Sequence, residues 1–312
     1  MEHLLTIVGP TAVGKTALTV QLATYLHTAV ISGDAYQVYR GLSIGTAKPT
    51  VEERAGISHY LIDICNPDDS YNVADFQEAA SHYIKKMNAD GHIPILSGGT
   101  GLYVQALLEG YQFSDRPPNQ KLRHFLDGLV AEKGQTGLQA YAQELAAKKG
   151  INLPFTDKHR LYRTIELIDA GDTASLLAPR KQGLIYDGPV IGLKRERSAL
   201  YDRINRRVDS MVEQGLFTEV AGLLEAGLSP DAQSLTGIGY REIVAYYKGL
   251  LSKEEAIESI KKHTRHFAKR QITWYKRMPY ITWLSIDEDM TDIDIFEQAK
   301  KLVKGRFDDF IR

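Results

Sequence analysis

The sequence predicts an α/β fold in which a doubly wound parallel sheet is interrupted by an inserted all-helical domain. Two observations carry this prediction. Short apolar segments alternate with helix-forming segments in roughly the first third of the chain, which is the order of strands and helices in a parallel sheet. From Lys121 to about Leu177 the pattern changes to helical segments without a convincing strand. We therefore place the core at residues 1–115 and 189–312, and the helical insertion at 116–188.

Length, net charge and cysteine content limit the classes of protein to which this chain can belong. A chain of 312 residues is long enough for about two domains of the usual ~100–200 residues. The net charge of −1 means that any nucleic-acid surface must come from local segregation of charge. One cysteine, Cys65, excludes an internal disulfide and a cysteine metal cluster, as is typical of a cytoplasmic protein. The N-terminus lacks a signal-peptide pattern, and no apolar run approaches the ~20 residues that span a membrane. We expect no membrane partner, and nothing in the sequence requires more than a monomer.

A glycine-bounded loop joins the first predicted strand, Leu4 to Val8, to the first predicted helix. Its sequence, GPTAVGKT, has the G-x-x-x-x-G-K-[ST] pattern of a phosphate-binding loop and indicates a P-loop NTPase-like core. The glycines let the backbone turn tightly and present its N–H groups to an anion, to which the helix adds its positive end. Lys15 would place a positive charge on the phosphates, and the Thr16 hydroxyl would bind Mg²⁺. The predicted phosphate-binding residues are Gly9, Pro10, Thr11, Ala12, Val13, Gly14, Lys15 and Thr16.

The second predicted strand, Ala29 to Ser32, delivers Asp34 to the carboxyl edge of the sheet, where open α/β folds place their ligands. The residue alone leaves three roles open: magnesium ligand, capping or loop hydrogen bond, and general base. The following elements complete the first half of the sheet. They are a strand and its exit over His59 to Pro67, a helix over 70–87, and a strand over Ile93 to Ser97 that enters GGTG at 98–101.

Two groups of basic residues follow in the insertion and in the resumed core. Lys158, Arg160 and Arg163 cluster on the third helix of the insertion, where a solvated charged face is the simplest interpretation. In the core, a strand over 190–193 precedes a helix over 198–213 that carries Arg203, Arg206 and Arg207. An arginine from this helix could clamp the charge of a leaving diphosphate, although surface ion pairing remains an alternative for each of the three.

The last long helix is predicted from Lys253 to about Met278, before a strand over 281–286. Its second half contains seven basic residues and no acidic one. One face carries Lys262, Arg265, Lys269 and Lys276, and the opposite face carries Ile260, Thr264, Phe267, Gln271 and Trp274. A one-sided basic helix in a nearly neutral protein favours a polyphosphate backbone as its partner, because a merely solvated helix usually mixes both signs of charge.

From the residues alone, two classes of reaction remain. One is a small-molecule kinase, in which the loop holds ATP and Asp34 activates a hydroxyl. The other is a transferase, in which the loop holds a diphosphate leaving group and a nucleic acid supplies the nucleophile. The basic helix favours the transferase, since a small acceptor needs no such surface. A clear Walker B strand is also missing from the pattern, and Asp63 is the nearest approach to one.

Several motifs together resemble the bacterial tRNA dimethylallyltransferases, also known as tRNA isopentenyltransferases. The resemblance runs in order from Gly9 to about Lys276 and rests on GPTAVGKT, SGDAYQVYRGLSIGTAKP, GGTGLY, DKHRLYRTIE, RINRRVDSMVEQGL, GIGYRE and AKRQITWYKR. It implies transfer of a dimethylallyl group from dimethylallyl diphosphate to the exocyclic amine of the adenosine 3′-adjacent to the tRNA anticodon. A relative that modifies free adenine nucleotides is the alternative within the resemblance.

The resemblance also implies roles for individual residues. Asp34 corresponds to the general base, and Lys15, Thr16 and Arg207 correspond to groups that stabilise the departing diphosphate together with Mg²⁺. The family usually has serine at the position of Ala35 and valine at that of Gly33, which leaves the fine geometry of the substrate open. The implied tRNA-contacting residues are Asp34, Ala35, Tyr36, Gln37, Thr100, Arg123, His159, Arg160, Leu161, Tyr162, Arg163, Gly239, Tyr240, Arg241, Lys269, Arg270, Gln271 and Trp274.

Overall fold

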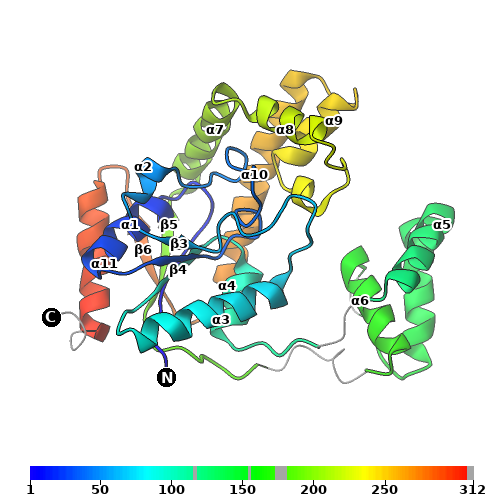
Figure 1. Ribbon diagram of the computed structural model, residues 1–312, viewed down its shortest axis with the longest axis horizontal. Helices are drawn as coiled ribbons and strands as arrows, with labels where there is room; N and C mark the ends of the chain where they lie inside the picture. Colours follow the sequence, from blue (N-terminus) through cyan, green and yellow to red (C-terminus); the bar gives the residue numbers. More distant parts are fainter. Residues whose placement is uncertain (115–117, 154–155, 173–180, 308–312) are drawn as a thin grey trace. The chain divides into compact units, whose positions relative to one another are not determined.

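The computed structural model describes residues 1–114, 118–153, 156–172 and 181–307. The chain divides into two compact units, a sheet-bearing core of Met1–Glu109 with Gly183–Arg312, and a helical unit of Gly110–Gln182 (Figure 1). The helical unit begins and ends six residues earlier than the insertion predicted at 116–188. The predicted boundary between residues 115 and 116 and the predicted end of the helical segment at about Leu177 lie outside the described residues.

The core contains a six-stranded, all-parallel sheet with the strand order β3-β2-β4-β1-β5-β6, which confirms the predicted fold class. The strands are β1 Leu5–Val8, β2 Val30–Ser32, β3 His59–Tyr60, β4 Ile95–Gly98, β5 Val190–Arg195 and β6 Ile281–Ile286. The last residue of β1, Val8, is in register with Gly98 of β4 and Gly192 of β5. The loops that follow β1 and β4 therefore leave the sheet at the same edge, next to the point where the strand order reverses.

The third strand is shorter than the predicted segment from His59 to Pro67. Leu61 and Asp63 have positive φ angles of 62° and 55°, in the left-handed region where an extended strand cannot continue. The carboxylate of Asp63 accepts a hydrogen bond from Lys48 Nζ at 2.5 Å. Asp63 is thus engaged in an ion pair with a buried lysine, and it is not one of the residues that line the large cavity described below.

Helices cover both faces of the sheet. They are α1 Lys15–Tyr25, α2 Val51–Arg54, α3 Val73–Ala89, α4 Gly101–Leu108, α7 Arg197–Glu213, α8 Leu216–Glu225, α9 Tyr240–Tyr247, α10 Lys253–Tyr275 and α11 Asp292–Phe307. Leu5 and Ile7 of β1 pack in one hydrophobic core with α1 and α11, which lie side by side, whereas Val8 faces a second core with α3 and α4 (Figure 1). This alternation along one strand makes the fold doubly wound.

The basic helix α10 packs against α7 and α9. It begins at a capping box of Ser252 and Glu255 and ends at Tyr275, three residues before the predicted end. Lys262, Lys269 and Lys276 are exposed as predicted. The fourth member of the predicted face, Arg265, is instead half-buried, because its Nη1 donates a hydrogen bond of 2.6 Å to Asn205 on α7.

The helical unit consists of α5, Gln120–Ala147, and α6, Lys158–Asp169. The two helical segments predicted before α6 are joined in α5 by a bend at Gly134, whose φ of 67° and ψ of −171° are not helical. Leu126 and Leu138 of α5 pack against Leu161 and Ile165 of α6 and form a small core of their own. Within the part of the chain that the structure describes, no helix has both the length and the apolarity to cross a membrane.

Candidate active site

The loop between β1 and α1 has the backbone conformation of an anion site. Gly9 and Gly14 have φ angles of 151° and 114°, in a region that favours glycine. Gly14 is the N-cap of α1, and no side chain caps the first turn of this helix. The first N–H groups of α1 are therefore available to an anion at the positive end of the helix dipole. Lys15 Nζ donates hydrogen bonds to the carbonyl oxygens of Gly9 at 3.0 Å and Pro10 at 2.9 Å, which holds its charge over the loop.

Three arginines from the second half of the core donate hydrogen bonds to the loop. Arg195 Nε, at the end of β5, donates to the Val13 carbonyl at 3.1 Å, and Arg203 Nε, on α7, donates to the Ala12 carbonyl at 2.9 Å. Arg207, one turn further along α7, donates from Nη1 to Thr11 Oγ1 at 3.3 Å. The carbonyl oxygens of residues 12 and 13 are thus bound by guanidinium groups, which fixes the orientation of the peptide groups in the loop.

Gln271 on α10 connects the two glycine-rich loops. Its Oε1 accepts the N–H of Thr11 at 2.9 Å, and its Nε2 donates to the carbonyl of Gly99 at 2.8 Å. The residue is 4% exposed. From the sequence, Gln271 lies on the face of α10 opposite the basic residues, and the family resemblance implies that it contacts tRNA. The structure places it in the packing face, with the additional function of bracing the phosphate-binding loop.

Asp34 follows β2 at the same edge of the sheet. Its Oδ1 accepts hydrogen bonds from the N–H groups of Tyr36 at 2.9 Å and Gln37 at 3.3 Å, and its Oδ2 accepts none among the described residues. Burial raises the pKa of Asp34, while these two N–H groups and the charges of Lys15 and Arg207 oppose the rise. The side chain is half-buried and lines a cavity, where the surrounding protein disfavours its charged form.

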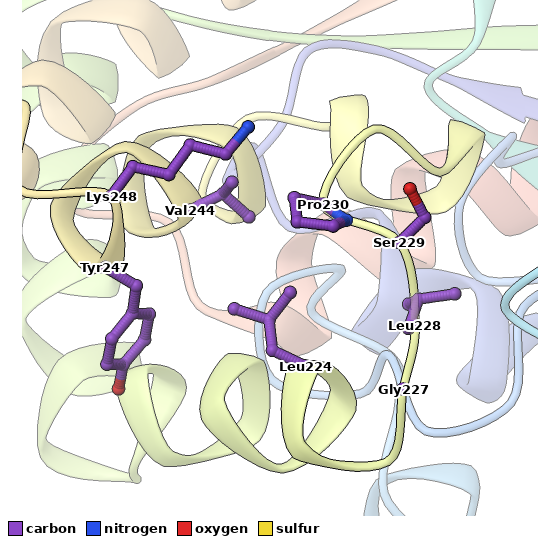
Figure 2. Close-up of a pocket in the computed structure, with 8 residues that line it drawn as sticks. All are labelled: Leu224, Gly227, Leu228, Ser229, Pro230, Val244, Tyr247 and Lys248. Atoms are coloured by element: carbon purple, nitrogen blue, oxygen red, sulfur yellow. The ribbon is translucent and has the colours of Figure 1, made fainter.

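A cavity of about 880 Å³ brings these groups together, within the size range of small-molecule sites. Its lining comes from the phosphate-binding loop, the segment after β2, the loop at 43–50, and the facing sides of α7 and α10. The predicted site residues that line it are Thr11, Ala12, Gly14, Lys15, Thr16, Asp34, Gln37, Arg207 and Gln271. A smaller hollow of about 330 Å³ lies between α8 and α9 (Figure 2). Its described lining includes neither carboxylate nor histidine nor cysteine, so the larger cavity is the candidate active site.

The cavity concentrates positive charge. Burial, followed by the charge of Arg207, lowers the pKa of Lys15 to about 8, and Asp34 opposes this shift. Burial also lowers the pKa of Arg207; the charge of Glu53 opposes this shift, the charge of Arg203 adds to it, and Asp34 opposes it. Cations that are buried beside one another without a matching number of carboxylates favour an anionic ligand, since such a ligand relieves both desolvation and repulsion.

The residues of the cavity fit a magnesium ion that is held mainly by a phosphorylated ligand. Among the described residues, no group of three or more His, Cys, Asp or Glu side chains could hold a metal. Thr16 nevertheless places a hydroxyl at the cavity wall, one residue after Lys15. Mg²⁺ keeps several waters and takes part of its coordination from substrate phosphates, and the hydroxyl at this position of a phosphate-binding loop is a usual magnesium ligand, so Thr16 fits this role.

The other predicted tRNA-contacting residues of the core differ in accessibility. Thr100 Oγ1 accepts the N–H of Ala35 at 3.1 Å and thereby joins the segment after β2 to the start of α4. Lys269 and Arg270 are exposed on α10, and Arg241 is exposed on α9. The Trp274 Nε1 atom is buried. Three further predicted residues lie at or near the start of α9. Gly239 is the N-cap of α9, Tyr240 is buried, and the hydroxyl of Tyr36 forms a hydrogen bond with that of Thr236.

In the helical unit, side-chain contacts are described for four of the six predicted residues. Arg123 donates from Nε and Nη2 to Glu166 at 2.6 and 3.2 Å, and Arg163 also reaches this buried carboxylate at 3.4 Å. Leu161 belongs to the core of the unit, and the Tyr162 hydroxyl donates to Asp127 at 2.8 Å. The exposed members of the predicted set on α6 are His159 and Arg160.

The parallel sheet and the glycine-bounded loop before α1 define an α/β protein of the P-loop class. In this protein the phosphate-binding loop and Asp34 line the same cavity. A family model described as IPP transferase matches residues 37–278. A protein of Bacillus anthracis named tRNA dimethylallyltransferase is 40% identical over 307 residues, which covers 98% of this chain and 96% of the relative. The chain therefore belongs to the IPP transferase family.

Solved structures agree with this assignment. The full-length tRNA isopentenylpyrophosphate transferase of Bacillus halodurans superposes with a TM-score of 0.76 at 39% identity, covering 99% of this chain and 98% of that one. A eukaryotic dimethylallyltransferase described as acting on tRNA superposes with a TM-score of 0.77 at 26% identity, covering 96% of this chain and 78% of that one.

Proposed function

We propose that this protein transfers the dimethylallyl group of dimethylallyl diphosphate to the exocyclic amine of the adenosine 3′-adjacent to the anticodon of tRNA. The observation that carries the proposal is the placement of Asp34 in the same cavity as Lys15 and Arg207. A transfer to an amine requires both a base and a group that stabilises the leaving anion, and one cavity supplies them. The names of the relatives support dimethylallyl as the group and tRNA as the acceptor.

In the proposed reaction the exocyclic nitrogen of the adenine forms a bond to the first carbon of the dimethylallyl group. The bond from that carbon to the diphosphate oxygen breaks, and its electron pair leaves with the diphosphate. Asp34 Oδ2 takes the proton that the amine loses. The N–H groups of Tyr36 and Gln37 hold Oδ1, so the second oxygen can face the amine. Because burial raises the pKa of Asp34, the carboxylate is a stronger base than an exposed aspartate.

The leaving diphosphate is stabilised by groups that the fold already holds in place. The N–H groups at the start of α1, Lys15 and Arg207 would bind its oxygens. Arg207 is kept near the loop by Thr11. Magnesium, held by the Thr16 hydroxyl and the diphosphate, would neutralise part of the charge that develops on the leaving group. The target adenine must leave the anticodon-loop stack to reach the cavity, which is a form of base flipping.

The RNA-binding surface of the core is proposed to include the exposed lysines of α10. Replacing Lys262 and Lys269 together by glutamine should weaken tRNA binding and lower the slope of log affinity against log salt by roughly 1 to 2. Binding of dimethylallyl diphosphate alone should not change, because neither lysine lines the cavity. Affinity measured over a salt series tests this. The matched control, Lys301→Gln with Lys304→Gln on α11, replaces two exposed lysines on another helix. An equal change of slope in the control would show that the lysines of α10 do not form a specific RNA-binding surface.

The charge state of Lys15 should appear in the pH profile. With a pKa of about 8 in the free enzyme, Lys15 carries its proton below that pH and loses it above. We expect kcat/KM for dimethylallyl diphosphate to fall above pH 8, because kcat/KM reports the free enzyme and the anion needs the charged lysine. In Lys15→Arg the guanidinium stays charged, so the residual activity should lack this decline. A wild-type profile that remains flat on the alkaline side would contradict the assignment.

A comparison of acceptors tests the proposed function against its alternatives. Purified protein with Mg²⁺ and labelled dimethylallyl diphosphate is offered an unmodified anticodon stem-loop, the same stem-loop with guanosine in place of the target adenosine, and free AMP. The proposal predicts label on the adenosine stem-loop alone. Label on AMP would instead identify an enzyme of free adenine nucleotides. Phosphate transfer from ATP to a small molecule, without prenyl transfer, would identify a kinase. We expect the protein to act in the cytoplasm and as a monomer, as predicted from the sequence.

A further inference from the structure

Three successive backbone N–H groups in the loop after β2 are bound by one carboxylate from a distant part of the chain. Glu219, in the first turn of α8, accepts the N–H of Ser43 at 3.0 Å, of Ile44 at 2.8 Å and of Gly45 at 3.2 Å. Consecutive N–H groups that converge in this way form an anion-binding concavity, which here is filled by the protein itself. Hydrogen bonds to an ionised carboxylate are stronger than those between neutral groups.

Tyr240 closes the same contact from α9. Its hydroxyl donates to Glu219 Oε1 at 2.5 Å, and the residue is 1% exposed. Its ring fills the space next to Gly45, where an added Cβ would lie 2.5 Å from Tyr240 Cε2. The loop, α8 and α9 therefore meet at the half-buried carboxylate of Glu219. The Tyr240 side chain is therefore enclosed by the protein in this structure.

The loop that Glu219 holds is connected to the proposed base. Ser43, Ile44, Thr46 and Ala47 line the cavity. The carbonyl oxygens of Thr46 and Ala47 each accept a hydrogen bond of 3.3 Å from the side-chain amide of Gln37. The N–H of Gln37 in turn donates to Asp34 Oδ1 at 3.3 Å.

Glu219 is thus connected to Asp34 in three steps: its hydrogen bonds to residues 43–45, the backbone that continues to Ala47, and the hydrogen bonds of Gln37 to residues 46 and 47 and to Asp34. We propose that Glu219 is a positioning residue for prenyl transfer: it fixes the loop at 43–47, and through Gln37 it fixes the orientation of the Asp34 carboxylate toward the acceptor amine. This inference rests on the function proposed above. The proposed role of Glu219 is distinct from that of the phosphate-binding loop, since none of its described hydrogen bonds involves residues 9–16.

The test compares Glu219→Gln with the matched control Glu225→Gln, which removes an exposed carboxylate from the last turn of the same helix. Glutamine keeps the size of the side chain but loses the charge and one acceptor oxygen. We expect kcat to fall roughly 10- to 100-fold, as displacement of a reacting group by about an ångström does, with KM for dimethylallyl diphosphate unchanged. Hydrogen exchange of the amides at 43–45 should accelerate in the same variant. The control should match the wild type in both measurements.

A second variant keeps the inference testable if Glu219→Gln folds poorly. Tyr240→Phe retains the ring beside Gly45 and removes one of the four hydrogen bonds to Glu219, so kcat should fall several-fold with a smaller change in exchange. An unchanged kcat and an unchanged rate of amide hydrogen exchange at 43–45 in both variants would overturn the inference. A loss of activity that is fully explained by a smaller fraction of folded protein would also overturn it. If the wild-type protein transfers no prenyl group, the proposed function fails and the positioning role with it, while the exchange data still decide whether Glu219 holds the loop.

Discussion

Replacing Asp34 by asparagine should lower kcat by about 10²- to 10⁴-fold, the contribution of a positioned general base, which corresponds to about 3 to 5 kcal/mol. Asparagine can still accept the N–H groups of Tyr36 and Gln37 through its amide oxygen, so the loop after β2 should keep its conformation. It cannot take the proton of the amine. Single-turnover transfer to tRNA at saturating concentrations of both substrates measures this loss without a contribution from binding.

Substrate binding distinguishes loss of the base from loss of the site. The affinity for dimethylallyl diphosphate should stay the same or increase in Asp34→Asn, because the variant removes one of the negative charges that act on Lys15 and Arg207. The matched control is Asp68→Asn, an exposed aspartate in the loop before α3, which should leave kcat unchanged. A kcat of Asp34→Asn within threefold of the wild type would exclude Asp34 as the base.

Replacing Lys15 by glutamine should lower kcat/KM for dimethylallyl diphosphate by about 10²- to 10³-fold, the loss that follows removal of one preorganised group facing a developing anion. The enclosed position of Lys15 makes the effect large, since its charge acts on the diphosphate in a region shielded from water. Steady-state kinetics with the diphosphate varied at saturating tRNA measure the change. Affinity for tRNA alone should remain near that of the wild type.

The control for Lys15 is Lys86→Gln, which neutralises an exposed lysine on α3 and should have no effect. Since removing a buried cation can also stabilise the fold, thermal unfolding of Lys15→Gln should be unchanged or shifted upward. Normal kcat/KM in a folded Lys15→Gln protein would mean that the loop does not hold the leaving group.

The sequence predicts best those parts of the site that are local in the chain. Gly9, Gly14, Lys15 and Thr16 lie within one strand–loop–helix segment, so their spacing alone specifies their geometry. The same holds for Asp34, which directly follows a short buried strand. The doubly wound order of the sheet is also predictable, because strands and helices alternate with distinct periods.

What the sequence does not reveal are contacts between residues far apart in the chain. Gln271 reaches Thr11 across 260 positions, and Glu219 reaches the loop at 43–45 across about 175. The pattern of α10 puts Gln271 on the face opposite the basic residues but does not show which loops it contacts, and Glu219 has the local pattern of a solvent-facing helix residue. Arg265 has the spacing of the exposed basic face but turns to Asn205 on α7, a choice that depends on tertiary packing. The strand at His59 ends early because the backbone turns left-handed at Leu61, where no glycine marks the turn.

The central claim is that this phosphate-binding loop holds the diphosphate of a prenyl donor while Asp34 removes a proton from tRNA. The most direct measurement is a single-turnover reaction with Mg²⁺, dimethylallyl diphosphate and an unmodified anticodon stem-loop, without ATP, in which released diphosphate and prenylated nucleoside are both counted. We expect one diphosphate to be released for each prenyl group transferred, and the prenyl group to be on the exocyclic amine of the single adenosine 3′-adjacent to the anticodon. A requirement for ATP, release of orthophosphate, or a prenyl group on another nucleotide would contradict the central claim.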